Sequence, residues 1–187
     1  MRLFIAIELA DEIKASLAHI QEVLKRSPSQ VKWVNPGQIH LTLRFLGETA
    51  EEKLEALKGA IREVAEGLSP FEFTLGPLGA FPKLENPRVL WVGIEKGQDS
   101  AKDIAQKLEE ALALLGFQKE ERAFTPHVTL GRVRFIKDRT RLVRTLKSPS
   151  LTAEGSMTVT ALSLIESTLT PQGPVYRTLD QFPLLAR

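Results

Sequence analysis

One short segment that occurs twice constrains this chain more than any other feature. Residues 39–43 read Ile-His-Leu-Thr-Leu and residues 126–130 read Pro-His-Val-Thr-Leu, and these copies contain two of the three histidines. Side chains two positions apart point to the same face of a β-strand, so each His shares a face with the Thr that follows it. The alternative is two ordinary strands whose histidines have only structural roles. The pattern itself predicts two half-buried strands with a polar pair on each (His40 with Thr42, His127 with Thr129).

The two copies belong to a longer repeat. Residues 2–8 (RLFIAIE) shifted by 87 positions fall on residues 89–95 (VLWVGIE), and the same shift moves His40 onto His127. Duplication of one unit is the simplest explanation of a shared offset. We therefore predict one bilobed domain over residues 1–187. The predicted fold class is α+β, with two pseudo-symmetric lobes of antiparallel sheet, helices outside and an active-site cleft between the lobes.

Hydrophobic periodicity and turn residues divide the chain into strands and helices. The predicted strands are residues 2–8, 31–34, 38–46, 71–75, 88–95, 157–169 and 175–182, together with one that starts at the second motif. The predicted helices are residues 10–26, 50–66, 99–115 and 137–147, with Asp11 as a cap near the start of the first. Residues 76–87 are interpreted as a loop or a hairpin. No glycine-rich phosphate loop follows any strand, which disfavours a doubly wound nucleotide-binding fold.

Composition excludes several classes of protein. The chain has 43% hydrophobic and 26% charged residues, as soluble globular proteins do. Cysteine is absent, which removes disulfides, zinc–thiolate sites and cysteine nucleophiles. The sequence has no apolar run of about 18 residues, and its first strand leads into acidic residues rather than into a cleavage site. We therefore expect a cytoplasmic protein with no membrane partner.

The distribution of charge is more informative than the net charge of +2, which is too weak to indicate nucleic-acid binding by itself. Basic residues are concentrated just after the second motif, where a single acid, Asp138, accompanies them. A solvated helix face is the usual interpretation of such a run, but its position here favours contact with phosphate. The basic residues are Arg132, Arg134, Lys137, Arg139, Arg141, Arg144 and Lys147.

Two histidines and two threonines in one site suit phosphodiester cleavage. Histidine titrates near neutral pH, so one neutral imidazole can take a proton from water while a protonated one delivers a proton to the leaving oxygen. The threonine hydroxyls could donate hydrogen bonds to the non-bridging oxygens of the phosphate. The residues alone leave open which histidine is the acid and which is the base.

These motifs resemble those of the two-histidine phosphoesterase superfamily, and in particular the RNA 2',3'-cyclic phosphodiesterases, also called 2'-5' RNA ligases. The similarity covers nearly the whole chain and includes the opening RLFIAIEL and Trp33-Val34. It continues through LTLRFLG at residues 41–47, TPHVTLGR at residues 125–132, and the closing segments around Ser167-Thr168-Leu169, Gly173-Pro174-Val175-Tyr176 and Phe182-Pro183-Leu184. The motifs are individually weak, but their joint order is specific.

The resemblance implies an enzyme that hydrolyses the 2',3'-cyclic phosphate end of an RNA to a 2'-phosphomonoester without a metal or another cofactor. It assigns His40 as proton donor and His127 as proton acceptor. It also implies reverse 2'-5' ligation as a secondary activity and tRNA fragments as candidate substrates. We further expect a monomer.

Other residues are weaker candidates for substrate contact. Arg132 would reach the face of His127 only if a bulge intervenes in the strand, because its parity is wrong, whereas Arg44 shares the parity of His40 and Thr42. Aromatic side chains could stack on a base. Core packing is the more common role for each of them, with Tyr176 the best exception; the others are Trp33, Phe45 and Phe124.

Two rival classes of function are weighed against the hydrolase. A non-catalytic RNA-binding module would use the basic run and the aromatic residues but would not need two repeated histidines. A metallohydrolase would use the histidines as ligands. Each motif, however, offers one imidazole with no His or Cys nearby, and Glu48 is the only acid close to the first motif.

Overall fold

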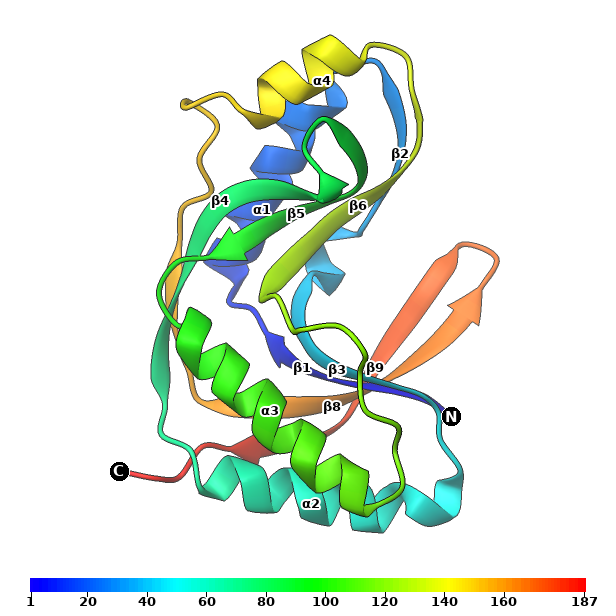
Figure 1. Cartoon of the computed structure of the whole chain (residues 1–187), viewed down its shortest axis with the longest axis vertical. Helices are drawn as coiled ribbons and strands as arrows, with labels where there is room; N and C mark the ends of the chain where they lie inside the picture. Colours follow the sequence, from blue (N-terminus) through cyan, green and yellow to red (C-terminus); the bar gives the residue numbers. More distant parts are fainter.

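The computed structural model describes all 187 residues (Figure 1). The strands are β1 (Arg2–Glu8), β2 (Ser29–Trp33), β3 (His40–Glu48), β4 (Phe71–Lys83), β5 (Asn86–Ile94), β6 (His127–Ile136), β7 (Ser156–Val159), β8 (Ala161–Thr170) and β9 (Gly173–Pro183). The α-helices are α1 (Asp11–Lys25), α2 (Leu54–Glu66), α3 (Gln98–Leu114) and α4 (Arg139–Leu146). Two short 3₁₀ turns, η1 (Pro36–Gln38) and η2 (Glu51–Lys53), precede β3 and α2.

The strands form two antiparallel sheets. The four-stranded sheet has the order β3-β1-β8-β9, and the five-stranded sheet has the order β2-β6-β5-β4-β7. Helices α2 and α3 pack beside the four-stranded sheet, whereas α1 and α4 lie at the five-stranded one (Figure 1). One cluster of 35 buried hydrophobic residues contains side chains from both sheets and all four helices. The predicted α+β class, with two antiparallel sheets and helices outside, is confirmed.

The two sheets do not correspond to the two halves of the sequence. The predicted shift of 87 residues moves β1 onto β5, β3 onto β6 and β4 onto the region of β8. In the sheets, however, β1 lies between β3 and β8, and β5 lies between β6 and β4. Of these three matched strands, each half therefore contributes two adjacent ones to one sheet and the third to the other. The duplication stays a prediction, and this exchange of strands is consistent with a single domain.

Most predicted elements are confirmed to within a few residues. Residues 76–87 form a hairpin rather than a loop, because β4 continues to Lys83 and pairs with β5. The prediction of Asp11 as a helix cap is wrong: Ala10 occupies the cap position, and no side chain bonds to the first amides. Asp11 instead lies in the first turn, where its charge suits the helix dipole.

The single strand predicted at residues 157–169 is two strands. Strand β7 pairs with β4 in the five-stranded sheet, whereas β8 pairs with β1 and β9 in the four-stranded sheet. The chain passes from one sheet to the other at Thr160, and the continuous alternation of its sequence hides that passage. None of the helices is both long enough and apolar enough to cross a membrane.

Candidate active site

The first motif opens β3. An Asx turn precedes it, in which Asn35 Oδ1 accepts a hydrogen bond from the amide of Gly37 at 3.0 Å and starts η1. His40 and Thr42 are half-buried, whereas Leu41 and Leu43 are buried in the core. The predicted division of this strand into a polar and an apolar face is therefore confirmed.

The second motif opens β6 in the same way. His127 and Thr129 are half-buried, and Val128 and Leu130 are completely buried. Strands β3 and β6 belong to different sheets but pack against each other. The fold thus places the two motifs at the junction of the sheets.

A β-bulge follows each motif and reverses the alternation of faces. In β3, Thr42 pairs with Ala6 and Arg44 with Ile5, so that Leu43 is an extra residue. The equivalent extra residue in β6 is Leu130. Beyond the bulges Arg44 and Gly131 are both buried, and the next residues, Phe45 and Arg132, are exposed. The prediction that Arg44 shares the face of His40 is wrong, and the bulge that Arg132 requires is present.

Arg44 anchors the segment that follows α3. Its guanidinium donates to the backbone carbonyl of Gln118 and to Glu120 Oε1, and its Nε forms an ion pair with Glu109 at 2.9 Å. Glu109 in turn accepts a hydrogen bond from the amide of Glu120 at 2.7 Å. Arg44 is only 8% exposed. Its role is therefore to hold β3, α3 and this segment together rather than to contact a substrate.

Gly131, the counterpart of Arg44 on β6, faces the edge strand of its sheet. A Cβ atom built at this position would lie 2.7 Å from Val31 Cγ1 and 3.0 Å from a ring atom of Trp33. Only glycine therefore fits the inward position at this bulge without displacing β2.

The imidazole of His40 is fixed by a hydrogen bond and two aromatic rings. Its Nδ1–H donates to the backbone carbonyl oxygen of Gln38 at 2.8 Å. A carbonyl can only accept, so this contact places the proton on Nδ1 and leaves Nε2 of the neutral ring as the acceptor. The ring stacks on Phe4 at 4.8 Å and meets the edge of Tyr176 at 5.3 Å.

The imidazole of His127 is held in the same way. Its Nδ1–H donates to the backbone carbonyl oxygen of Thr125 at 2.6 Å, which again leaves Nε2 available. Phe81 approaches edge-on at 5.0 Å, and Trp91 lies at 6.0 Å. Each histidine therefore presents the same nitrogen and is surrounded by two aromatic rings.

The electrostatic surroundings of the two histidines differ. Burial lowers the pKa of His40 below its usual value. The hydrogen bond to Gln38 and the carboxylate of Glu8, directly opposite on β1, partly oppose this effect, whereas the charge of Lys14 adds to it. Burial also lowers the pKa of His127, and there the guanidinium of Arg132 lowers it further. The residue opposite His127 is Gly93, which carries no charge. In the pairing register β1 and β5 thus correspond with an offset of 85, since 93 − 8 = 85, which is two residues less than the 87 that relates the two motifs.

Tyr176 and Arg132 connect the two half-sites. Burial raises the pKa of Tyr176, and the charges of Arg2 and Arg132 oppose that shift, so both guanidinium groups act on the phenol. Arg132 also acts on His127, and Tyr176 touches His40. Although they come from distant parts of the sequence, the predicted site residues therefore form one neighbourhood around the junction of the sheets.

The remaining candidates are placed less uniformly. Phe45 is 61% exposed and lies 6.0 Å from Phe4, whereas Trp33 and Phe124 pack against the core. In the basic run, Arg139 bonds to Asn86 and Lys147 pairs with Glu85. No group of three or more His, Cys, Asp or Glu side chains is arranged to hold a metal ion.

Sequence reasoning missed four residues of the site. Three are aromatic rings around the imidazoles, and the fourth is a carboxylate. Phe4 and Glu8 lie in the repeated segment RLFIAIE and Trp91 in VLWVGIE, so the repeat marked the strands that hold three of them, although it did not give their register. The four residues are Phe4, Phe81, Trp91 and Glu8.

Comparison with known proteins decides the family. The family model described as LigT like Phosphoesterase matches residues 7–91 and, a second time, residues 92–176. The chain belongs to the LigT-like phosphoesterase family. The family assignment made from the motifs is therefore confirmed, and both matches include one histidine motif.

Several relatives are similar to this chain over nearly their full length. The RNA 2',3'-cyclic phosphodiesterase of Archaeoglobus fulgidus is 37% identical, covering 97% of this chain and 99% of the relative. That of Methanothermobacter thermautotrophicus is 34% identical, covering 98% and 99%. Among solved structures, a Thermus thermophilus protein superposes with a TM-score of 0.81 at 30% identity, and E. coli LigT complexed with 3'-AMP with 0.78 at 28%. Each structural match covers 99% of this chain and 98% of the other.

Proposed function

We propose that this LigT-like phosphoesterase hydrolyses the 2',3'-cyclic phosphate at the end of an RNA to a 2'-phosphomonoester. Full-length relatives with the name RNA 2',3'-cyclic phosphodiesterase support this substrate. The observation that carries the mechanism is the matched pair of Nδ1–H···O=C hydrogen bonds, which leaves Nε2 of both His40 and His127 for the substrate. If the two histidines had only structural roles, nothing would require both rings to present the same nitrogen.

In the proposed reaction, His127 Nε2 takes a proton from a water molecule whose oxygen attacks phosphorus. The bond between phosphorus and the 3'-oxygen breaks, and protonated His40 donates its Nε2 proton to that oxygen. The products are a 2'-phosphomonoester and a free 3'-hydroxyl group. The reaction consumes one water, and no oxidant, reductant or metal enters the balance. General acid and base catalysis of this kind contributes about 10² to 10⁴-fold for each group.

Two of the neighbouring charges fit this direction. Glu8 favours the protonated form of His40, as an acid requires, and Arg132 favours the neutral form of His127, as a base requires. Burial and the charge of Lys14 act against the protonated form of His40, so the direction follows the family resemblance in the first place. Thr42 and Thr129 would donate to the non-bridging oxygens, where charge develops in the transition state. Arg132 would neutralise the phosphate, and Tyr176 would pack against the terminal nucleotide.

Product identification tests the proposal. Purified protein is incubated with an RNA oligonucleotide that ends in a 2',3'-cyclic phosphate, in the presence of a chelator, and the product is identified by mass spectrometry and by comparison with 2'- and 3'-phosphate standards. We expect the 2'-phosphate. A 3'-phosphate product, or turnover that the chelator abolishes, would contradict the mechanism. Binding without turnover would favour the non-catalytic RNA-binding alternative.

Three finer predictions accompany the hydrolysis: a secondary ligase activity, a class of RNA substrate and a monomeric state. If the 5'-hydroxyl of a second RNA takes the place of water, the same proton transfers join the two ends through a 2'-5' linkage, so 2'-5' ligation is proposed as the secondary activity. tRNA halves with cyclic ends are proposed as substrates. Light scattering tests the predicted monomer.

A further inference from the structure

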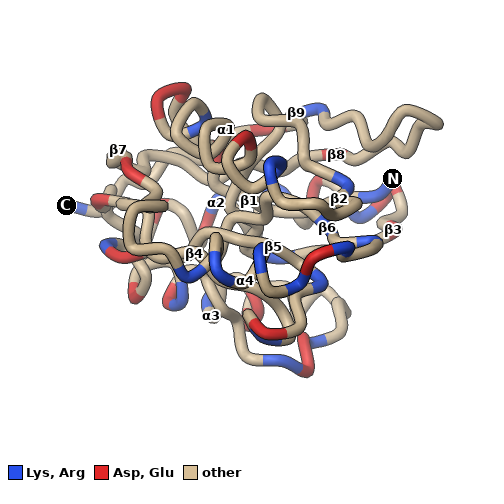
Figure 2. Tube along the Cα trace, turned by 90° about the horizontal axis from the view of Figure 1, so that it is seen from above, with Lys and Arg blue, Asp and Glu red and all other residues tan.

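Three cationic side chains lie beside one another on the face of the five-stranded sheet that also carries His127. Lys32 on the edge strand β2 is directly opposite Arg132 on β6, and Arg134 follows two residues further along β6. All three side chains are exposed, whereas Val31 and Val133 between them pack against the core. Figure 2 shows Lys and Arg residues on β2, β6 and the neighbouring α4. This face therefore carries His127 at the start of β6 and positive charge towards the end of β6.

These cations have no acidic partners. None of the three takes part in an ion pair, although other exposed lysines do, such as Lys96 with Glu72. Like charges directly opposite each other destabilise a sheet. The pair formed by Lys32 and Arg132 therefore costs stability in the free protein. Phosphates bound at this face, the terminal one at Arg132 and an upstream one at Lys32, would offset that cost.

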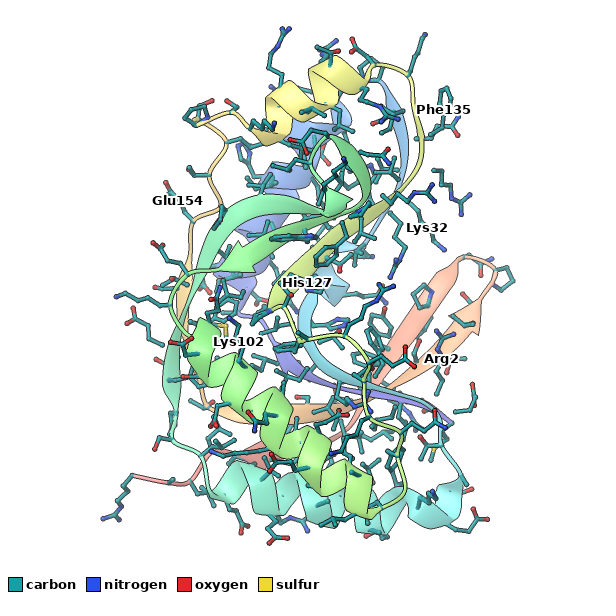
Figure 3. All side chains as sticks on the ribbon, viewed as in Figure 1. Arg2, Lys32, Lys102, His127, Phe135 and Glu154 are labelled. Carbon is teal, nitrogen blue, oxygen red and sulfur yellow. The ribbon has the colours of Figure 1, made fainter.

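The position of the cations relates them to the reaction site. Arg134 lies seven residues beyond His127 on β6, which at about 3.3 Å per residue is a distance of about 23 Å along a regular strand, somewhat less with the two bulges of β6. A phosphate held at His127 and Arg132 belongs to the terminal nucleotide, and that nucleotide is too short to reach Arg134 as well. In Figure 3, Lys32 and Arg2 lie on the same side of the molecule, Lys32 on the five-stranded sheet and Arg2 on the four-stranded sheet.

We infer that Lys32 and Arg134 bind backbone phosphates of the RNA strand upstream of the cyclic end. This inference rests on the proposed function and specifies its substrate class, which is an oligoribonucleotide rather than a cyclic mononucleotide. Phosphate contacts of this type position a strand without reading its sequence. The enzyme therefore gains affinity from the length of the RNA, and base identity in the upstream strand has little effect.

A cavity elsewhere offers a competing route for the strand. It has a volume of about 540 Å³ and is lined by Phe45 of β3, with Lys53 and Lys119 among its other lining residues. Its acids are already engaged, because Glu120 pairs with Arg44 and Glu48 with the N-terminal amine. The two routes differ in the lysines that they use, so substitutions can separate them.

The experiment compares two substrates that share the reacting group. One is 2',3'-cyclic AMP, and the other is a decanucleotide that ends in the same cyclic nucleotide. The variants are Lys32→Gln, Arg134→Gln and the double variant. Lys102→Gln on α3, away from β2 in Figure 3, is the control with the same change of charge, and Lys119→Gln reports on the cavity. For each protein, kcat/KM is measured on both substrates between 50 and 300 mM salt, and decanucleotide binding is measured by fluorescence anisotropy.

We expect the ratio of kcat/KM on decanucleotide to that on 2',3'-cyclic AMP to fall about threefold for each single variant and about tenfold for the double variant. The fall should come from KM, with kcat unchanged. The slope of log(kcat/KM) for the decanucleotide against log salt should decrease by about 0.7 for each cation removed. Lys32→Gln should also leave the melting temperature unchanged or raise it, which a structural role for Lys32 would not do.

Three outcomes overturn the inference. The ratio could stay unchanged in both Lys32→Gln and Arg134→Gln, it could fall equally in Lys102→Gln, or it could fall in Lys119→Gln instead, which would assign the strand to the cavity. Failure of the proposed function is distinct: wild-type protein would then hydrolyse neither substrate. In that case the anisotropy measurement still decides the inference, because the variants must weaken decanucleotide binding if it holds.

Discussion

The two half-sites have the same motif and different neighbours. Both histidines donate Nδ1–H to a backbone carbonyl two residues earlier in the chain, and both lie among aromatic rings. A carboxylate, Glu8, lies opposite His40, whereas Gly93 lies opposite His127. After each bulge the first exposed residue differs: it is Phe45 on β3 and Arg132 on β6.

This difference teaches how a nearly symmetric fold can give two equivalent groups different roles. Symmetry supplies two imidazoles in the same orientation, which by itself leaves the acid and the base interchangeable. Glu8 stabilises a proton on His40, and Arg132 disfavours one on His127. Glu8 and Arg132 therefore make the two half-sites unequal in the sense that the proposed direction of proton transfer requires, whereas Lys14 opposes Glu8 at His40.

The largest expected effect comes from removing either imidazole. His40→Ala and His127→Ala should each lower kcat by about 10² to 10⁴-fold. A substrate with sulfur in place of the 3'-oxygen separates the two roles, because a thiolate, with a thiol pKa of about 8.5, leaves without a proton. On that substrate His40→Ala should recover most of its loss, and His127→Ala should not.

The measurement is single-turnover kinetics on the oxygen and sulfur substrates. Recovery by His127→Ala instead of His40→Ala would reverse the acid and base assignments. Equal losses on both substrates would mean that neither histidine protonates the leaving group.

The two threonines should have large and similar effects. Thr42→Val and Thr129→Val keep the shape of the side chain but remove the hydroxyl donor, and each should lower kcat by about 10²-fold. Thr152→Val, in an exposed loop, is the matched control and should leave kcat unchanged. Steady-state kinetics would contradict donation in the transition state if only KM changed.

The buried arginine and the exposed arginine near the bulges should differ in their effect on stability. Arg44→Met leaves Glu109 and Glu120 without their cation and should lower the free energy of unfolding by about 3 kcal/mol. Arg132→Met, at an exposed position without an ion pair, should change it by less than about 0.5 kcal/mol. Urea unfolding measures both. Equal losses would show that Arg132 also holds the fold together.

The smallest expected effect is a shift in the pH profile. The Glu8 carboxylate raises the pKa of His40, so Glu8→Gln should lower that pKa, and protonated His40 is then lost at lower pH. The alkaline limb of kcat/KM should therefore move to lower pH, while the acidic limb, assigned to His127, stays in place. The amide can still accept the hydrogen bond from Thr178 Oγ1. A shift of the acidic limb instead would exchange the two assignments.

Much of the fold and the centre of the site could be predicted from local sequence. Alternation of polar and apolar residues located the strands. It also correctly put Leu41 and Val128 in the core, on the other face of the strand from the histidines. The same alternation failed at residues 157–169, because a continuous pattern does not reveal that β7 and β8 join different sheets. Pairing partners lie far away in the sequence, and a local pattern contains no information about them.

The environment of the histidines was likewise beyond local patterns. Phe81 reaches His127 from the hairpin of β4 and β5, and Tyr176 reaches His40 from β9. Neither strand is adjacent in sequence to the motif that its aromatic ring contacts. The repeat marked the strands that hold Phe4 and Trp91, but only the pairing register revealed that Glu8 and Gly93 are the residues opposite the histidines.

The sequence by itself determined that each motif is a strand with His and Thr on one face, because side-chain direction in a strand follows from covalent geometry. Tertiary structure decided which way the side chains after each motif point. The bulges at Leu43 and Leu130 arise from pairing with β1 and β5, and they turn Arg44 inward and Phe45 and Arg132 outward. A bulge depends on the register between two strands distant in the sequence, which only the folded chain fixes.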